Sequence, residues 1–354
     1  MTAVVDPSDM TRWATWREIH AQPDIWAAWG AQVDIADLRA WVDAQSVNEV
    51  WFCGAGTSAY IGDIIAAAWP TGAGTGTGPR LRSVPSTDLV ADPTAWLPPK
   101  GPRPLVVSFG RSGNSAESLG TLDALDARAP EAPRLHITCN PDGALARRPS
   151  TGPLRVVSLP EATHDAGFAM TSSFSTILLT ALAIFGPPCD FAGHMVALAK
   201  QMRGLLRNAL PLPRPARAVY LGSGPLTFAA REAALKVMEL TAGQTPALWD
   251  STLGFRHGPK SFVTDDCAVT MFLSPQSPTS HYDADLVAEL RAQFPHTRVT
   301  SVGPAAAGVP SPDVALSMPF GPAWAAPLCV AMAQLDGARW AADLGLTVDD
   351  PFAG

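Results

Sequence analysis

The sequence predicts an α/β fold with two tandem domains, each built on a parallel sheet flanked by helices. Short apolar runs alternate with helical patterns along most of the 354 residues, which is typical of strands buried on both faces. Two stretches also repeat one plan of apolar run, Gly-x-Gly turn and helical pattern: VNEVWFCGAGTSAY and ARAVYLGSGPLTFAA. Gly54-x-Gly56 and Gly222-x-Gly224 lie at equivalent places, which indicates an internal duplication.

The elements follow in order along the chain. Residues 1–45 hold five tryptophans at spacings that fit short amphipathic helices. A first α/β domain is expected over 46–206 and a second over 218–354, with the proline-rich segment 207–217 as linker. Beyond the two duplicated runs, further strands are predicted at 104–110, 134–140, 154–160, 267–274 and 298–303.

Composition excludes several classes of protein. The net charge of -7 argues against nucleic-acid binding, because phosphate backbones attract surplus Lys and Arg. The five cysteines are widely spaced and form no CxxC, so buried reduced thiols are expected, without zinc or disulfides. The start of the chain lacks a signal-peptide pattern, and the apolar segment 168–186 is predicted to be a buried helix and no membrane span. A cytoplasmic protein without metal is expected.

The first glycine turn, GAGTSA, has two readings. It matches G-x-G-x-x-A, but Asp88 comes too late for the acidic residue of a dinucleotide site. The favoured alternative is that Thr57 and Ser58 offer hydroxyls and backbone N–H groups to an anion at a helix N-terminus. The later glycine tract 71–79 follows a helix and is expected to be a surface turn.

The stretch SFGRSGNSAES, residues 108–118, is a second candidate anion site. It follows an apolar run, turns on two glycines and places Ser112, Asn114, Ser115 and Ser118 before a helix. Dense hydroxyl and N–H groups suit a phosphate monoester, whose oxygens accept many hydrogen bonds. An ordinary N-capped turn is the alternative, and this stretch alone does not choose between them.

The helical pattern REAALKVMEL carries the candidate acid/base groups. Glu232, Lys236 and Glu239 fall at i, i+4 and i+7, so they share one helix face. A surface ion pair is the default for such spacing. Here the surrounding residues are apolar, which favours a buried carboxylate–ammonium cluster that acts as an acid/base site.

The loop TLGFRHGPKSF, residues 252–262, presents His257 between two glycines and a proline. These residues argue against a regular helix or strand and favour a rigid bend. Arg256 and Lys260 flank the histidine, with a role in the fold, a phosphate site or a subunit contact left open. His164 lies in another glycine-and-hydroxyl turn and is a second candidate.

Together these motifs resemble the sugar isomerase (SIS) domain family. The matching residues are CGAGTS (53–58), SFGRSGNSAES (108–118), CNPDGALAR (139–147), HDAGFAMTSSF (164–174), EAALKVME (232–239) and GFRHGPKSFV (254–263). Their order is similar to the isomerase half of glucosamine-6-phosphate synthase. The amino-acid sequences of the motifs more closely resemble the branch of tagatose-6-phosphate ketose/aldose isomerases and galactosamine-6-phosphate deaminases. This resemblance is clearest in REIHAQPDIW (17–26), 164–174, 250–263 and LGLTVDDPF (344–352).

The resemblance implies roles for the catalytic candidates. Glu239 would move a proton between C1 and C2 of an open-chain sugar phosphate, and Lys236 would neutralise charge near the developing enediol or enolamine oxygen. Glu232 would hold Lys236 or take part in proton handling, while His257 would open the sugar ring. In the synthase this histidine comes from the neighbouring subunit, which implies a homodimer or larger homo-oligomer with shared sites.

The resemblance also implies a substrate site and a reaction. The residues expected around the substrate and its phosphate are Gly56, Thr57, Ser58, Arg111, Ser112, Asn114, Ser115, Phe168 and Ala169. The expected reaction converts D-galactosamine 6-phosphate to D-tagatose 6-phosphate and ammonia without a cofactor. The sequence departs from the synthase in that no lysine follows Lys260, and it contains no glutaminase region, so glutamine-dependent synthesis is not expected.

Two rival functions remain at this stage. A phosphosugar-sensing module needs only the phosphate turn and could lose the Glu–Lys–Glu face, whereas this chain keeps that face and His257. A fructosamine-6-phosphate deglycase would use the same scaffold and release an amino acid. The configuration of the sugar and the form of its amine stay open.

Overall fold

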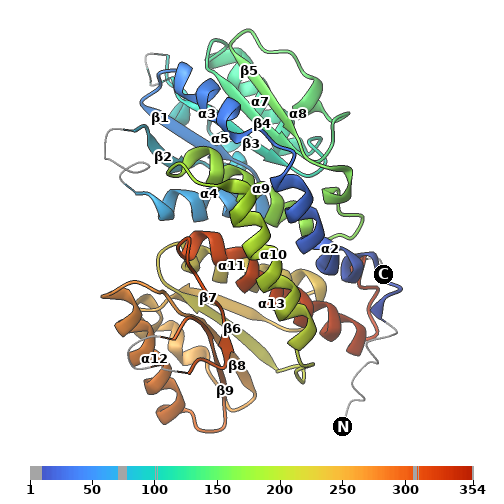
Figure 1. The fold of residues 1–354 in the computed structure, drawn as a ribbon, viewed down its shortest axis with the longest axis vertical. Helices are drawn as coiled ribbons and strands as arrows, with labels where there is room; N and C mark the ends of the chain where they lie inside the picture. The colour runs from blue at the N-terminus through green and yellow to red at the C-terminus, as the bar shows by residue number, and fades with distance from the viewer. Residues whose placement is uncertain are drawn as a thin grey trace. The chain divides into compact units, whose positions relative to one another are not determined.

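The computed structural model describes residues 10–70, 78–99, 101, 103–305, 309 and 311–352. Two compact units emerge, one made of 24–164 and 172–196 and the other of 1–23, 165–171 and 197–354. Each unit holds one five-stranded parallel sheet with helices around it (Figure 1). The predicted fold class, two tandem α/β domains after an N-terminal helical segment, is confirmed. Most of the glycine tract expected to form a surface turn, residues 71–77, lies outside the described residues.

The first sheet has the order β2-β1-β3-β4-β5, all parallel. Its strands are β1 (Glu49–Cys53), β2 (Arg80–Ser83), β3 (Leu105–Gly110), β4 (Arg134–Thr138) and β5 (Leu154–Ser158). The helices of this unit are α3 (Ile35–Ala44), α4 (Thr57–Ala68), α5 (Ser86–Ala91), α6 (Pro93–Trp96), α7 (Ala116–Arg128), α8 (Ala144–Arg147) and α9 (Ser172–Phe185), with a 3₁₀ turn η1 (Glu161–Thr163).

The second sheet has the order β10-β9-β8-β6-β7, also all parallel. Its strands are β6 (Arg217–Gly222), β7 (Ala247–Ser251), β8 (Cys267–Phe272), β9 (Arg298–Gly303) and β10 (Val314–Ala315). The helices are α11 (Pro225–Leu240), α12 (Thr279–Gln293) and α13 (Pro322–Asp343), with 3₁₀ turns η2 (Gly254–His257) and η3 (Pro259–Phe262). Helices α2 (Ala14–Gly30) and α10 (Phe191–Asn208) contribute residues to both units.

The internal duplication extends to backbone angles. With strands numbered from the first of each sheet, both orders read 2-1-3-4-5. Gly56 adopts φ 55° and ψ −127°, and Gly224 adopts φ 58° and ψ −129°, a region open in practice to glycine. A Cβ at Gly54 or at Gly222 would lie 2.6 Å from a backbone atom of the helix that follows. The two Gly-x-Gly motifs therefore make the same tight strand-to-helix turn.

The apolar segment 168–186 contains α9, and every residue of that helix is buried. Buried hydrogen bonds tie it to the tryptophans of α2, because Trp26 Nε1 donates to Ser175 Oγ at 3.0 Å and Trp29 Nε1 to Thr180 Oγ1 at 2.9 Å. Ser175 and Thr180 of this apolar run thus serve as acceptors inside the core. Among the helices that the structure describes, none combines the length and apolarity that a membrane span requires.

Three stretches far apart in the sequence meet in the second unit: the start of α2, the loop 165–171 and the C-terminal segment 344–352. Asp349 caps α2, accepting from Ala14 N at 2.9 Å through Oδ2 and from Thr15 N at 2.8 Å through Oδ1. Glu18 Oε1 accepts from Ala166 N at 2.6 Å, and the Asp349 carbonyl accepts from Phe168 N at 2.8 Å. The three stretches overlap segments whose sequence resembles the deaminase branch. Their common structural role is to hold one another in place through these hydrogen bonds.

We predict that Asp349→Ala lowers the free energy of unfolding by about 1–3 kcal/mol, because α2 loses its cap and Thr15 its hydroxyl acceptor. Urea denaturation followed by circular dichroism measures this loss. Asp350→Ala is the matched control, since Asp350 is exposed, and its effect should stay within about 0.5 kcal/mol. Equal effects of the two substitutions would contradict the capping role.

Candidate active site

The hydroxyl-rich turns of the first domain lie at its topological switch point. β1 and β3 are neighbours in register, with Cys53 beside Ser108, and the chain leaves them toward opposite sides of the sheet. In open α/β sheets, ligands bind at the carboxyl ends of the strands where the order reverses. The turns after β1 and β3, residues 54–58 and 111–115, therefore meet at the place where this fold binds ligands.

The segment that follows β4 forms hydrogen bonds to the turn after β3. Asn140 Nδ2 donates to the Ser112 carbonyl at 3.0 Å, and Ala144 N donates to Asn114 Oδ1 at 2.8 Å. Ser115 caps α7, accepting from Ser118 N at 3.2 Å, and Asn114 and Ser115 stay exposed. The turn is thus both an N-capped helix start and a fixed set of exposed polar groups, so the two readings of the sequence are compatible.

The turn after β1 is more deeply set. Thr57 and Ser58 are 4% and 6% exposed at the start of α4, and Gly56 leaves open space where a Cβ would stand. Arg111 is half-buried beside the other turn. Backbone N–H groups at the first turn of a helix attract an anion, and the helix dipole adds to that attraction.

The equivalent switch point of the second domain is filled by the protein's own carboxylate. Ser223, Thr252 and Ser274 follow β6, β7 and β8, and all three turn toward Asp283 of α12. Its Oδ1 accepts from Ser223 Oγ at 2.7 Å and Thr252 Oγ1 at 2.6 Å, and its Oδ2 accepts from Ser274 N at 2.8 Å. Burial raises the pKa of Asp283, although these hydrogen bonds oppose the shift. At the second switch point, the chain thus satisfies these hydroxyl and N–H groups with its own carboxylate.

On α11, the predicted Glu–Lys–Glu face forms one ion-paired cluster. Lys236 Nζ lies 2.6 Å from Glu239 Oε2 and 3.3 Å from Glu232 Oε1. Lys236 and Glu232 are wholly buried, whereas the Glu239 side chain is 21% exposed. Glu239 is therefore the member of the cluster that a substrate can reach.

The charge state of Lys236 is set by competition between burial and its two neighbours. Burial alone would lower the pKa of the ammonium, but Glu232 and Glu239 outweigh it and raise the pKa above the ordinary lysine value. Lys236 thus stays charged at neutral pH and holds Glu239 in one position. A positioned carboxylate at an accessible edge of a buried ion cluster is equipped for proton transfer.

His257 ends the 3₁₀ turn η2 and is exposed, whereas Phe255 two residues earlier is fully buried. The backbone of Gly258 has φ 129°, a conformation that glycine adopts readily. The flanking cations both pair with Glu289 of α12: Arg256 Nε donates to Oε2 at 2.8 Å, and Lys260 Nζ contacts Oε1. In this structure Arg256 and Lys260 anchor the loop on both sides of the histidine.

Glu239 and His257 belong to different elements of the second unit. His257 lies in the segment between β7 and β8, where Arg256 and Lys260 on either side of it pair with Glu289 of α12. Glu239 is the penultimate residue of the 16-residue helix α11. At 1.5 Å per residue, Glu239 lies roughly 20 Å from the start of α11. Among the described residues, no hydrogen bond or ion pair joins the Glu239 carboxylate to the His257 imidazole.

The remaining candidates lie in and beside the loop 165–171. Ala169 is fully buried, and Phe168 is 43% exposed with its ring edge-on to Phe352 at 5.0 Å between centroids. Asp165 closes the loop by accepting from Thr171 N at 2.8 Å. His164 stands just outside it, with its backbone N–H bonded to the Glu161 carbonyl.

Sequence reasoning missed the carboxylates that shape these sites from a distance. Asp283, Glu289 and Glu18 each bond to a turn that the sequence had singled out. Asp283 and Glu289 lie outside the motifs quoted above, whereas Glu18 lies within REIHAQPDIW. Their bonds to Thr252, Arg256 and Ala166 span 31, 33 and 148 positions. Local sequence pattern does not reveal such pairings.

The fold, with its two duplicated parallel sheets, defines a protein of tandem sugar isomerase (SIS) domains. No family model matches the chain. The chain is 41% identical over 303 residues to the putative D-galactosamine-6-phosphate deaminase AgaS of Escherichia coli K12, covering 81% of this chain and 78% of that protein. It is 37% identical to the corresponding protein of Streptomyces coelicolor over 98% and 93% of the two chains.

Solved structures agree with this likeness. The crystal structure of tagatose-6-phosphate ketose/aldose isomerase from Escherichia coli matches with a TM-score of 0.87 and 35% identity, over 98% of both chains. The chain therefore belongs to the family of the AgaS D-galactosamine-6-phosphate deaminases.

We predict that Lys236→Met destabilises the fold by about 3–5 kcal/mol, because buried Glu232 loses its counter-ion. Adding Glu232→Gln to that variant should recover most of the loss, since the buried charge is then gone. Urea denaturation of the two variants beside Glu239→Gln measures the effect. A Lys236→Met protein as stable as the unsubstituted one would contradict the buried cluster.

Proposed function

We propose that this protein is a phosphosugar isomerase and deaminase that converts D-galactosamine 6-phosphate to D-tagatose 6-phosphate and ammonia. The observation that carries the proposal is the partly exposed Glu239 carboxylate, 2.6 Å from a wholly buried, charged lysine. Membership of the AgaS family supplies the substrate class, because the relatives are named for that deamination. The alternatives of sensing and deglycation gain no comparable support.

The reaction needs a phosphate anchor, and the turns at the first switch point suit that task. Ser112, Asn114 and Ser115 offer side chains and N–H groups after β3, while Gly56 to Ser58 offer the start of α4. Arg111 adds a positive charge next to them. Phe168 and Ala169 are proposed to line the sugar side of the site.

Proton transfer then proceeds at the other end of the sugar. His257 passes a proton between ring oxygen and O1, which opens the ring and exposes the C1 aldehyde. Glu239 removes the C2 proton and returns it to C1, while O1 gains a proton and the C2 amine loses one. C1 thereby becomes a hydroxymethyl group, and C2 becomes an imine. Water adds to that imine, and ammonia leaves as the C2 ketone forms. Every step is acid/base chemistry for which the chain supplies the groups.

Lys236 acts on this chemistry through Glu239. Because its side chain is wholly buried and donates to Glu239 Oε2, its charge orients the base and offsets its negative charge. Glu232, which is wholly buried, is the second carboxylate that pairs with Lys236. We therefore propose Glu239 as the catalytic group, with Lys236 and Glu232 as its positioning residues.

The oligomeric state is part of the proposal. Since no contact joins Glu239 to His257 within the described part of the chain, we propose a homodimer or larger homo-oligomer in which one subunit brings His257 to its partner's Glu239. A cytoplasmic location is proposed as well, supported by five free cysteine thiols, four of them buried.

We predict that Glu239→Gln lowers the rate of ammonia release from galactosamine 6-phosphate by about 10²–10⁴-fold, because a general base is lost. KM should change little, since phosphate binding lies elsewhere. Ammonia release is measured with a coupled assay across galactosamine, glucosamine and their N-acetylated 6-phosphates. Undiminished turnover in the variant would refute Glu239 as the base, and release of an amino acid from a fructosamine 6-phosphate instead of ammonia would favour the deglycase.

A mixing experiment tests the shared site. Glu239→Gln and His257→Ala proteins are each expected to be inactive, but co-expressed dimers should regain about one quarter of the activity. Half of the dimers are mixed, and each mixed dimer holds one site with both groups intact. A mixture as inactive as its parents would show that both groups serve one site within the same chain.

A further inference from the structure

The second unit contains a cavity of about 690 Å³ in the size range of small-molecule sites. It lies among α10, the segment 209–212, β9, the region around β10 and α13. None of the residues proposed above for catalysis or phosphate binding lines it. The cavity is therefore independent of the proposed active site.

Two arginines face this cavity without a carboxylate partner. Both Nη atoms of Arg298 lie 3.3 Å from the Pro213 carbonyl, and Arg339 donates to the Ala209 carbonyl at 3.1 Å and the Leu210 carbonyl at 3.3 Å. Among the residues that the structure describes, neither guanidinium forms an ion pair. Carbonyl groups orient these side chains, and the carboxylate of Asp336 acts on both guanidinium groups without forming an ion pair with either. Within the described part of the chain, neither arginine therefore has a carboxylate in direct contact.

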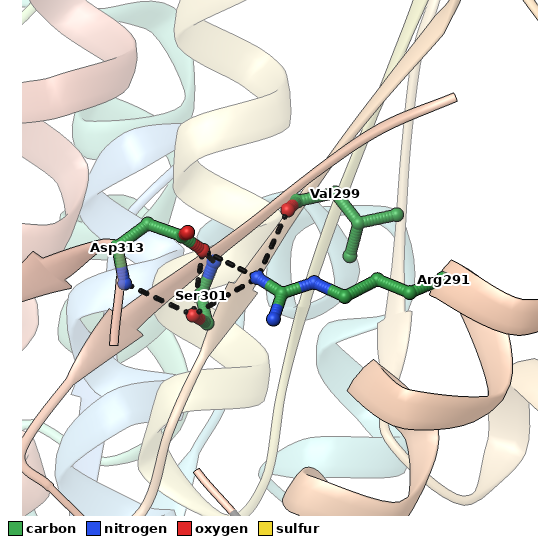
Figure 2. A network of polar contacts seen from close by, with 4 residues as sticks. All are labelled: Arg291, Val299, Ser301 and Asp313. Carbon is green, nitrogen blue, oxygen red and sulfur yellow. Dashed lines mark hydrogen bonds and ion pairs between the residues drawn. The ribbon is translucent and has the colours of Figure 1, made fainter. Parts of the chain in front are cut away.

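The two acidic residues of the cavity, Asp313 and Asp336, differ in whether other side chains bind them. Asp313 is engaged by Arg291 Nη2 at 2.6 Å and by Ser301 N and Oγ at 2.7 Å each, a network that fixes one wall (Figure 2). Asp336 makes no hydrogen bond or ion pair within the described part of the chain. Burial raises its pKa to about 7, against the opposing influence of Arg339 and Arg298.

The rest of the lining is open and largely apolar. Residues 298–300 of β9 are only half-buried, although inner strands of such a sheet are normally covered on both faces. Leu205, Leu316 and Leu335 are buried and line the space, and a Cβ at Gly204 of α10 would meet no atom within 4 Å. The protein thus leaves the space unfilled beside an apolar wall.

We propose that this cavity binds a small organic carboxylate with an apolar body, its carboxylate paired with Arg298 and Arg339 and its hydrocarbon part against the leucine wall. A planar carboxylate matches the guanidinium fork and supplies the direct carboxylate contact that the two arginines lack. A phosphate would call for the dense hydroxyl and N–H groups that the first-domain turns have and this cavity does not. When neutral, Asp336 can donate a hydrogen bond to the bound group.

Octanoate is the probe, titrated by calorimetry into the intact protein at pH 6.5. Binding is expected with a Kd below about 1 mM, and each of Arg298→Gln and Arg339→Gln should weaken it at least about tenfold. Gly204→Leu, which fills the cavity and leaves all charges in place, should abolish binding. Val196→Leu on the exposed face of the same helix is the control and should bind as the unsubstituted protein does.

The pH dependence gives a second readout. The charged or titratable groups acting on or near Asp336 are Arg339 on its own helix, Arg298 on β9 and Tyr220 on β6. Ionised Asp336 repels a carboxylate, so affinity should fall about tenfold from pH 6 to pH 8, and Asp336→Asn should remove that dependence. Binding that survives Gly204→Leu, equal binding of hexylamine, or preferential binding of inorganic phosphate would overturn the proposal.

Discussion

The site depends on one arrangement of charges: a lysine buried between two carboxylates on α11. Removing three charged groups from water costs several kcal/mol per ion, and only close pairing offsets that cost. Lys236 satisfies both partners within 3.3 Å, and Glu239 is the one group of the three that retains contact with solvent. The contacts that stabilise the cluster inside the protein also hold its partly exposed carboxylate, Glu239, in one orientation.

Each of the two duplicated domains has a topological switch point. The two differ in that the Asp283 carboxylate binds the turns of the second one. Both domains keep the same strand order and the same glycine angles at the first turn. In the second domain, the hydroxyls of Ser223 and Thr252 are satisfied by Asp283, so that turn serves the fold. In the first domain, the turn after β3 keeps Asn114 and Ser115 exposed. The duplicated turns therefore stabilise the fold in the second domain and present exposed polar groups in the first.

Much of this follows from the sequence, for definite reasons. The α11 face is predictable because its three charged residues sit at helical spacing among apolar neighbours, and the Gly-x-Gly turns because only glycine tolerates their backbone. β7 was not foreseen, since an edge strand half-buried along its whole length lacks the apolar run that marks central strands. The cap that Asp349 gives to α2 joins residues 334 and 335 positions apart, a pairing that local pattern cannot reveal.

Helix α13 connects the buried charges to the cavity of the second unit. Gly337 is where α13 packs on α11: a Cβ there would lie 2.9 Å from Leu240 Cδ1 and 3.3 Å from the Lys236 carbonyl. Asp336 and Arg339, on the same turn of α13, face the cavity. The close approach at Gly337 leaves no room for a larger side chain there, because interiors are packed without voids. One face of α13 therefore packs tightly against the helix that carries Lys236, and Asp336 and Arg339 lie at the cavity.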